Sequence, residues 1–273
     1  MSKYGIHKDV WRVVVFGREE APYRIALAAS MCPAILGELT EQSEEDSEGF
    51  VVWTPYRSLH EAENSMVARE CHDRSASVVI RNALAKWAMA QTDPETAIQS
   101  LAKWDRKLGV WCAAAVAETV LKYVLVGSIR PRIAIETSRA WVLGRATVQQ
   151  LRLVQGDIAG GSAEAAAFCV AAGTSLEFTG SSSFLPGYAA FCAASAEEKA
   201  IALRSAVYPS VEEMAKSRNL ATRRLRPVIA DAIINYPTAE AIADSKGVVR
   251  SIAAPAAIGV VSGALAVFLS RHR

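Results

Sequence analysis

The chain has 273 residues, of which 51% are hydrophobic and 21% charged, a composition that excludes intrinsic disorder and suffices for a substantial core. Its 30 lysines and arginines nearly balance its 28 aspartates and glutamates, so the net charge of +2 gives no argument for nucleic-acid binding. The five cysteines are far apart and form no CxxC pair, which favours free thiols in a reducing compartment, and we therefore expect a cytoplasmic protein.

Residues 1–57 are predicted to form an N-terminal segment of mixed character. Residues 10–17 combine valines with aromatic residues and favour either a strand or the opening of a helix, while residues 50–53 favour a short extended run. Residues 22–40 carry apolar side chains at helical spacing and predict a helix that Pro33 interrupts. We expect a small irregular or β element in this part of the chain.

From residue 58 to residue 246 the sequence predicts a domain made of helices. Helical spacing continues from residue 58 to about residue 91, and Asp93 followed by Pro94 supplies a new helix start. We expect the helix that begins at Pro94 to end near Gly109. Residues 110–126 are apolar on nearly every helical face, a pattern typical of a central, buried helix. N-cap and capping-box residues predict further helix starts at Thr147, at Ser195 with Glu198, and at Ser210.

The stretch from Arg130 to Gly144 carries the signals of a complete helix. Pro131 suits the first helical turn, where no backbone N–H is needed, and Gly144 can adopt the left-handed conformation that ends a helix. Within this helix three charged residues follow each other at spacings of four and three, which predicts a carboxylate between two guanidiniums. These three residues are Arg132, Glu136 and Arg139.

Residues 104–194 contain a series of short motifs in a recognisable order. The motifs are Trp111-Cys112-Ala113-Ala114, Glu118, Leu121, Arg130-Pro131-Arg132, Ala134-Ile135-Glu136, Arg139, Trp141, Gly144, Ser162-Ala163-Glu164-Ala165-Ala166-Ala167 and Pro186-Gly187-Tyr188-Ala189-Ala190. In order and spacing this stretch resembles the immunity proteins of bacterial polymorphic-toxin systems, in the family usually called the fifth immunity family. The resemblance implies a helical protein that binds and neutralises a cognate toxin and catalyses no reaction. The chain departs from the family pattern at Ser128, where an acidic residue is usual.

Four residues of the predicted helix from Arg130 to Gly144 are candidates for contact with a protein partner: Arg132, Glu136, Arg139 and Trp141. The alternative for the three charged residues is an ion-pair ladder within one helix, where each pair contributes only a few tenths of a kcal/mol. The alternative for Trp141 is a place in the core, because burial of its large side chain is favourable. The residue pattern leaves both alternatives open.

The sequence gives no support for a metal site, a cofactor or catalysis. Six residues are of the right types to bind zinc, but the spacing of the histidines matches no known motif. They are His60, Glu63, Glu70, Cys71, His72 and Asp73. The chain contains no Gly-rich phosphate loop, no HExxH motif and no nucleophile elbow. We therefore expect a non-enzymatic protein with no bound cofactor.

The last segment, residues 247–273, has a composition of its own. Residues 251–270 carry no charge and have the length of a membrane-spanning helix, although their many alanines and glycines weaken the signal. They form either a C-terminal membrane anchor or a helix packed in the core. In the first case basic residues would flank the membrane segment, namely Arg223, Arg224, Arg226, Arg250 and Arg271.

Taken together, these patterns predict an all-α fold, an Ala-rich multi-helix bundle or helical array. The function we expect is toxin neutralisation by stoichiometric binding of a cognate protein toxin. The alternative is a membrane-anchored helical scaffold or assembly protein that associates with the membrane through its C-terminus. No nucleic-acid motif is present, and the sequence leaves open whether the chain forms a homo-oligomer.

Overall fold

The computed structural model describes five strands between residues 4 and 55 and the residues 58–64, 75–156, 162–174, 184–205 and 209–244. The strands are β1 (Tyr4–Ile6), β2 (Trp11–Val15), β3 (Arg24–Ala28), β4 (Leu36–Glu41) and β5 (Val51–Pro55). They form one antiparallel sheet in the order β1-β5-β4-β3-β2. This sheet is the small β element expected near the N-terminus.

The helix predicted for residues 22–40 is wrong, because β3 and β4 occupy this stretch. β3 pairs along its whole length with β2, and most of it also pairs with β4. Apolar residues at helical spacing therefore gave a misleading signal here, since hydrogen bonds to neighbouring strands override local periodicity. For residues 10–17 the sequence left a strand and the opening of a helix open, and the structure has the strand β2 there. The short extended run expected at residues 50–53 falls in β5.

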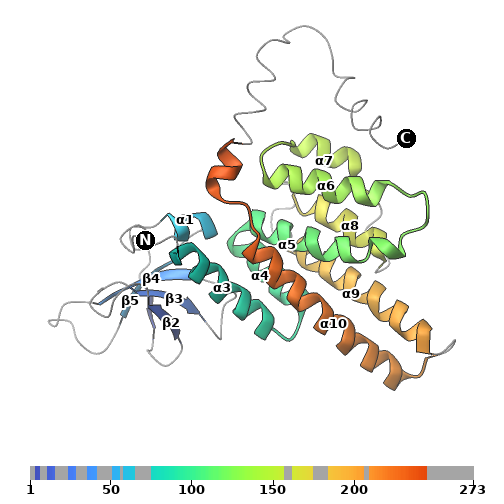
Figure 1. The fold of residues 1–273 in the computed structure, drawn as a ribbon, viewed down its shortest axis with the longest axis horizontal. Helices are drawn as coiled ribbons and strands as arrows, with labels where there is room; N and C mark the ends of the chain where they lie inside the picture. The colour runs from blue at the N-terminus through green and yellow to red at the C-terminus, as the bar shows by residue number, and fades with distance from the viewer. Residues whose placement is uncertain are drawn as a thin grey trace, which may run out of the picture.

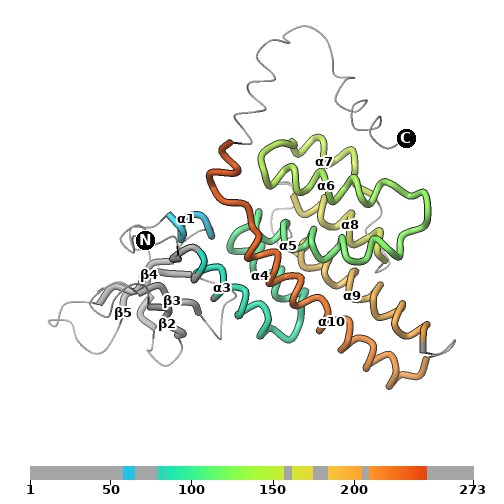
Figure 2. The backbone as a smooth tube through the Cα atoms, viewed as in Figure 1, coloured from blue at the N-terminus to red at the C-terminus, as the bar shows by residue number. Residues whose placement is uncertain are grey.

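Helices follow the sheet and make up the rest of the described chain (Figure 1). They are α1 (Leu59–Glu63), α3 (Ser75–Ala90), α4 (Pro94–Trp104), α5 (Arg106–Thr119), the short 3-10 helix η3 (Leu121–Tyr123), α6 (Arg130–Val142), α7 (Val148–Val154), α8 (Ala163–Ala172), α9 (Phe184–Ser205) and α10 (Val211–Ile234). Their packing confirms the predicted Ala-rich helical bundle. α10 lies beside α3, so the end of the described chain returns to its first long helix (Figure 2).

The centre of the bundle is built on α5 and α8. α5 packs against α4, α6, α8, α9 and α10, as expected of the central helix predicted from residue 110 onward. It ends at Thr119, however, and the predicted extension to residue 126 is wrong, because Leu125 and Val126 are exposed. All ten residues of α8 except Glu164 are buried, and most of them are alanines. Small side chains allow helices to approach closely, and Gly109 shows this most clearly: a Cβ there would lie 2.4 Å from the Cα of Ala102 in α4. The glycine therefore sets the distance between α4 and α5.

Most of the predicted helix starts are confirmed by side-chain caps. Asp93 caps α4, while Thr147 and Ser210 form capping boxes at α7 and α10. Gly144 follows α6 with a φ of 73°, in the left-handed region. The start predicted at Ser195 is wrong, because α9 runs through this position without a break.

The helix that begins at Pro94 ends earlier than predicted, because Asp105 separates it from the next helix. One carboxylate oxygen of Asp105 accepts hydrogen bonds from the backbone N–H groups of Lys107 and Leu108, at 3.1 and 3.2 Å, and so caps α5. The other oxygen accepts a hydrogen bond of 3.1 Å from the backbone N–H of Leu59. One buried carboxylate thus fixes the corner between α4 and α5 and holds α1 against it.

A buried ion pair joins α1 to α3, and hydrogen bonds from the same arginine reach the end of α10. The Arg81 Nε of α3 lies 2.6 Å from Glu63 Oε1 of α1, and both side chains are only 9% exposed. Arg81 also donates hydrogen bonds to the backbone carbonyls of Ile234, at 2.9 Å, and of Tyr236. The guanidinium therefore ties α1 and α3 to the end of α10.

None of the described helices is both long enough and apolar enough to cross a membrane. The uncharged residues 251–270, Arg250 and Arg271 lie outside the described residues.

Candidate functional site

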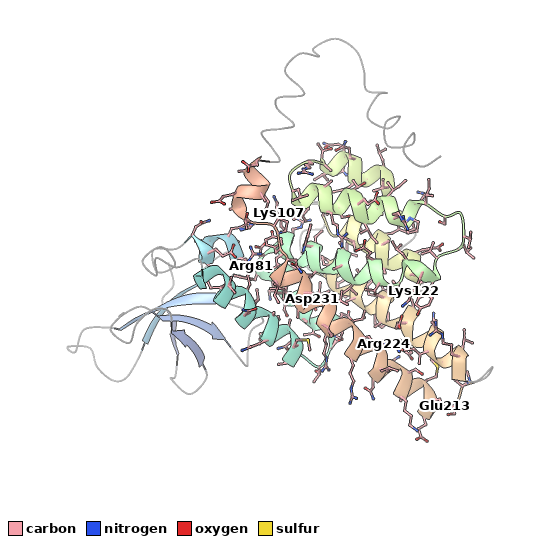
Figure 3. All side chains as sticks on the ribbon, viewed as in Figure 1. Arg81, Lys107, Lys122, Glu213, Arg224 and Asp231 are labelled. Atoms are coloured by element: carbon pink, nitrogen blue, oxygen red, sulfur yellow. The ribbon has the colours of Figure 1, made fainter. Side chains whose placement is uncertain are left out.

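A surface hollow of about 360 Å³ opens between α5, α6 and α10. It is lined by Trp111, Ala115, Glu118 and Thr119 of α5, by Arg139 of α6, by Val228, Asp231 and Ala232 of α10, and by Asn235 just after α10. Trp111, Ala115 and Glu118 follow each other at spacings of four and three, so they lie on one face of α5. Asp231, labelled in Figure 3, faces them from α10.

Arg139 is the central side chain of this hollow. Its Nη2 donates a hydrogen bond of 2.6 Å to Glu118 Oε2, and its guanidinium carbon lies 5.5 Å from the centre of the Trp111 ring. The ion pair is only partly shielded from water, since the side chains of Arg139 and Glu118 are 31% and 52% exposed. These contacts hold the guanidinium between the indole ring and the carboxylate.

Two polar groups in the hollow have no hydrogen-bond partner within the described part of the chain. The Arg139 Nε is buried and unpaired, which leaves one donor unsatisfied. The Asp231 carboxylate is exposed and likewise makes no ion pair there. A buried donor without a partner costs free energy, so the Arg139 side chain is held in this position at some cost.

The predicted ladder within α6 is wrong, because Arg139 pairs with Glu118 on α5 and not with Glu136. Arg132 and Glu136 are exposed, and no ion pair joins them in the described chain. Trp141 lies apart from the hollow and packs against the core. Positive charges of α5 approach its ring, with the Arg106 Cζ at 5.9 Å and the Lys107 Nζ at 5.8 Å.

Of the four residues proposed from the sequence, only Arg139 lines the hollow. Trp111, Glu118 and Asp231 were not singled out as contact residues from the pattern alone. For Glu118 a signal was present, because it interrupts an otherwise apolar helix. For Asp231 the sequence gave no such signal, because its position opposite α5 depends on how α10 packs against helices far away in the sequence.

The basic residues of α10 are largely engaged within the molecule, and Figure 3 labels one of them, Arg224. Arg224 donates a hydrogen bond of 2.6 Å to Glu197 Oε1, and Arg226 donates one of 2.8 Å to the Thr92 carbonyl. Arg218 donates to Glu198 at 3.0 Å, while Arg223 is exposed. The predicted role of Arg223, Arg224 and Arg226 beside a membrane segment stays a prediction, and two of these side chains already have partners.

Glu197 is contacted by three side chains, one of which is Arg224. Besides Arg224, it accepts a hydrogen bond of 2.7 Å from the Tyr123 hydroxyl and lies 3.2 Å from the Lys122 Nζ. Burial alone would raise the pKa of Glu197, but these hydrogen bonds and charges outweigh it and hold the pKa below its ordinary value. Glu197 therefore carries a negative charge that fastens η3 and α10 to α9.

The thiol and imidazole groups of the described chain give no catalytic cluster. Cys112 is free and buried, and burial raises the pKa of its thiol. The His60 Nδ1 lies 3.4 Å from Glu63 Oε2, as their spacing predicts. No group of three potential metal ligands occurs among the residues the structure describes. Cys71, His72 and Asp73 lie outside those residues.

No family model, no curated protein and no solved structure matches this chain.

Proposed function

We propose that the chain neutralises a protein toxin by stoichiometric binding, and that the hollow between α5, α6 and α10 is part of the contact surface. The observation that carries the proposal is the convergence of Trp111, Glu118 and Arg139 in this hollow. All three belong to the motifs on which the resemblance to immunity proteins rests. They come from two helices and lie up to 28 positions apart, so a shared local helix face does not explain their meeting.

The chemistry of the hollow supports a protein partner. Tryptophan and arginine are enriched among the residues that dominate binding energy at protein interfaces. Here the contacts with Glu118 and the indole ring hold the Arg139 guanidinium in place before binding, which lowers the entropic cost of association. The exposed Asp231 carboxylate, which lines the hollow, offers an acceptor.

The test begins with the reading frames that flank this gene. We expect one of them to arrest bacterial growth when it is expressed alone, and co-expression of the full chain to restore growth. Arg139→Glu should abolish this rescue and weaken binding to the purified toxin by about tenfold or more, as for a central interface residue. Arg145→Glu is the matched control, because Arg145 is an exposed arginine just after α6 and does not line the hollow.

Two results would contradict the proposal. Growth arrest by a flanking frame that the full chain fails to relieve would remove the toxin-binding function. Equal rescue by Arg139→Glu and Arg145→Glu would keep the function but place its contact surface elsewhere. The scaffold alternative is tested separately, by carbonate extraction of membranes from cells with the full chain or a chain that ends at Gly247. An anchored scaffold stays in the pellet only with its C-terminal segment.

A further inference from the structure

An exposed apolar turn links the end of η3 to the start of α6. Within this turn, residues 125–129, the side chains of Leu125, Val126 and Ile129 are 78%, 106% and 57% exposed. Single exposed aliphatic residues are common on protein surfaces, but three within five residues form a patch. The segment runs along the right-hand edge of the molecule in Figure 1, where no other described element covers it.

The turn has a defined backbone conformation. The backbone N–H of Ser128 donates a hydrogen bond of 3.0 Å to the Leu125 carbonyl, which closes a four-residue turn. Gly127 has a φ of 95°, as the third residue of such a turn requires. The turn therefore holds Val126 outward at its apex.

Between Glu118 and Glu136, the charged residues of the sequence that contains this turn are all positive. From residue 119 to residue 135 the sequence contains no aspartate or glutamate, and its charged residues are Lys122, Arg130 and Arg132. Lys122 is paired with Glu197. Arg130 donates a hydrogen bond of 3.1 Å to the Gln155 carbonyl through one nitrogen, and Arg132 is exposed. Arg130 and Arg132 thus lie directly after the apolar apex, with donors available to anions.

We propose that the apolar turn inserts into the surface of an anionic lipid bilayer, with Arg130 and Arg132 on the headgroup phosphates. The convex apex favours this occupant over a protein, because a fluid apolar layer adapts to a projecting side chain without a matching groove. Charge complementarity supports it, since each basic residue near an anionic surface strengthens attraction. This inference rests on a surface separate from the hollow and is independent of the toxin-binding function.

The experiment is flotation of the purified full chain with vesicles of phosphatidylcholine, with or without phosphatidylglycerol. The tip variant is Leu125→Asp with Val126→Asp. Its matched control is Leu203→Asp with Val211→Asp, which changes two aliphatic side chains that are 66% and 89% exposed on other elements. Arg132→Gln tests the charge, and thermal unfolding shows whether each variant keeps its fold.

We expect the full chain and the control variant to float with anionic vesicles and far less with neutral ones. The tip variant should bind anionic vesicles about tenfold or more weakly, because it loses two aliphatic groups from the apolar layer. Arg132→Gln should weaken binding by a smaller factor. Absence of flotation, or equal flotation of tip and control variants, overturns the proposal. If the tip variant instead loses only its binding to a protein, the turn is a protein contact and the lipid proposal is wrong.

Discussion

Two ion pairs with the same shortest nitrogen–oxygen distance but different burial should differ severalfold in their contribution to stability. The Arg81–Glu63 and Arg139–Glu118 pairs both have a nitrogen–oxygen distance of 2.6 Å. The side chains of the first pair are 9% exposed each, whereas those of the second are 31% and 52% exposed. Replacing each arginine by methionine keeps much of the side-chain volume and removes the charge.

For Arg81→Met we expect a loss of about 3–5 kcal/mol in the free energy of unfolding, because the variant leaves the Glu63 carboxylate buried without its counter-charge. The carbonyls of Ile234 and Tyr236 also lose their donor. For Arg139→Met the exposed ion pair contributes about 0.2–1 kcal/mol, and its contact with the Trp111 ring about 0.5–1 kcal/mol. The free energy of unfolding of a protein domain is about 5–15 kcal/mol, so the loss expected for Arg81→Met is a large fraction of the total stability.

The assay is equilibrium unfolding in urea, followed by the far-ultraviolet circular dichroism of the helices. The double variant Arg81→Met with Glu63→Gln should recover part of the loss, because it removes the uncompensated charge. If Arg81→Met and Arg139→Met lose the same free energy of unfolding, the distance between the charged atoms, and not their burial, determines how much each pair contributes to stability. A double variant that is no more stable than Arg81→Met would refute the explanation by an unpaired buried charge.

Three further predictions follow from the described contacts. The pKa of Glu197 is lower in the folded state than in the unfolded state. Its contribution to stability is therefore present above the ordinary carboxyl pKa and is lost as the pH falls through the folded-state pKa. Glu197→Gln should remove this loss and so flatten the acid limb of a profile of stability against pH. Gly109→Ala should lower the free energy of unfolding by about 1–3 kcal/mol through a clash with Ala102, whereas exposed Asn219→Ala should change it by less than about 0.5 kcal/mol. Cys112 should react with a thiol reagent only as fast as the chain unfolds, because it is buried, and prompt labelling under native conditions would contradict its position.

The sequence was most informative where structure depends on neighbouring residues. Asp93, Thr147 and Ser210 cap helices through their own backbone, so the signal lies within four residues of each start. Asp105 has the same chemistry but stands inside a stretch of sustained helical spacing, and it was missed. The strands β3 and β4 were missed for a related reason, since hydrogen bonds to neighbouring strands, and not the residues within the segment, decide whether such a segment is extended.

The candidate site was predicted less well than the fold, because it depends on contacts between helices. Spacing within one helix suggested that Arg139 pairs with Glu136, but the packing of α5 against α6 brings Glu118 closer to the guanidinium. Trp141 shows the same limit. It lies near Arg139 in the sequence, but two positions along a helix turn a side chain to nearly the opposite face.

Because α8 consists mostly of buried alanines, the centre of this bundle should tolerate smaller side chains but not larger ones. An alanine has no rotamers to lose when it is buried, so the helix enters the core without the side-chain entropy cost that leucine or methionine would incur. Truncation of such residues removes little, since only one carbon lies beyond the backbone. Enlargement is different, because every neighbour lies at a distance set by a methyl group. Accepted substitutions at the buried alanines of α8 should therefore be confined to glycine, serine and cysteine, and a deep mutational scan of these positions would show a sharp cut-off by side-chain volume.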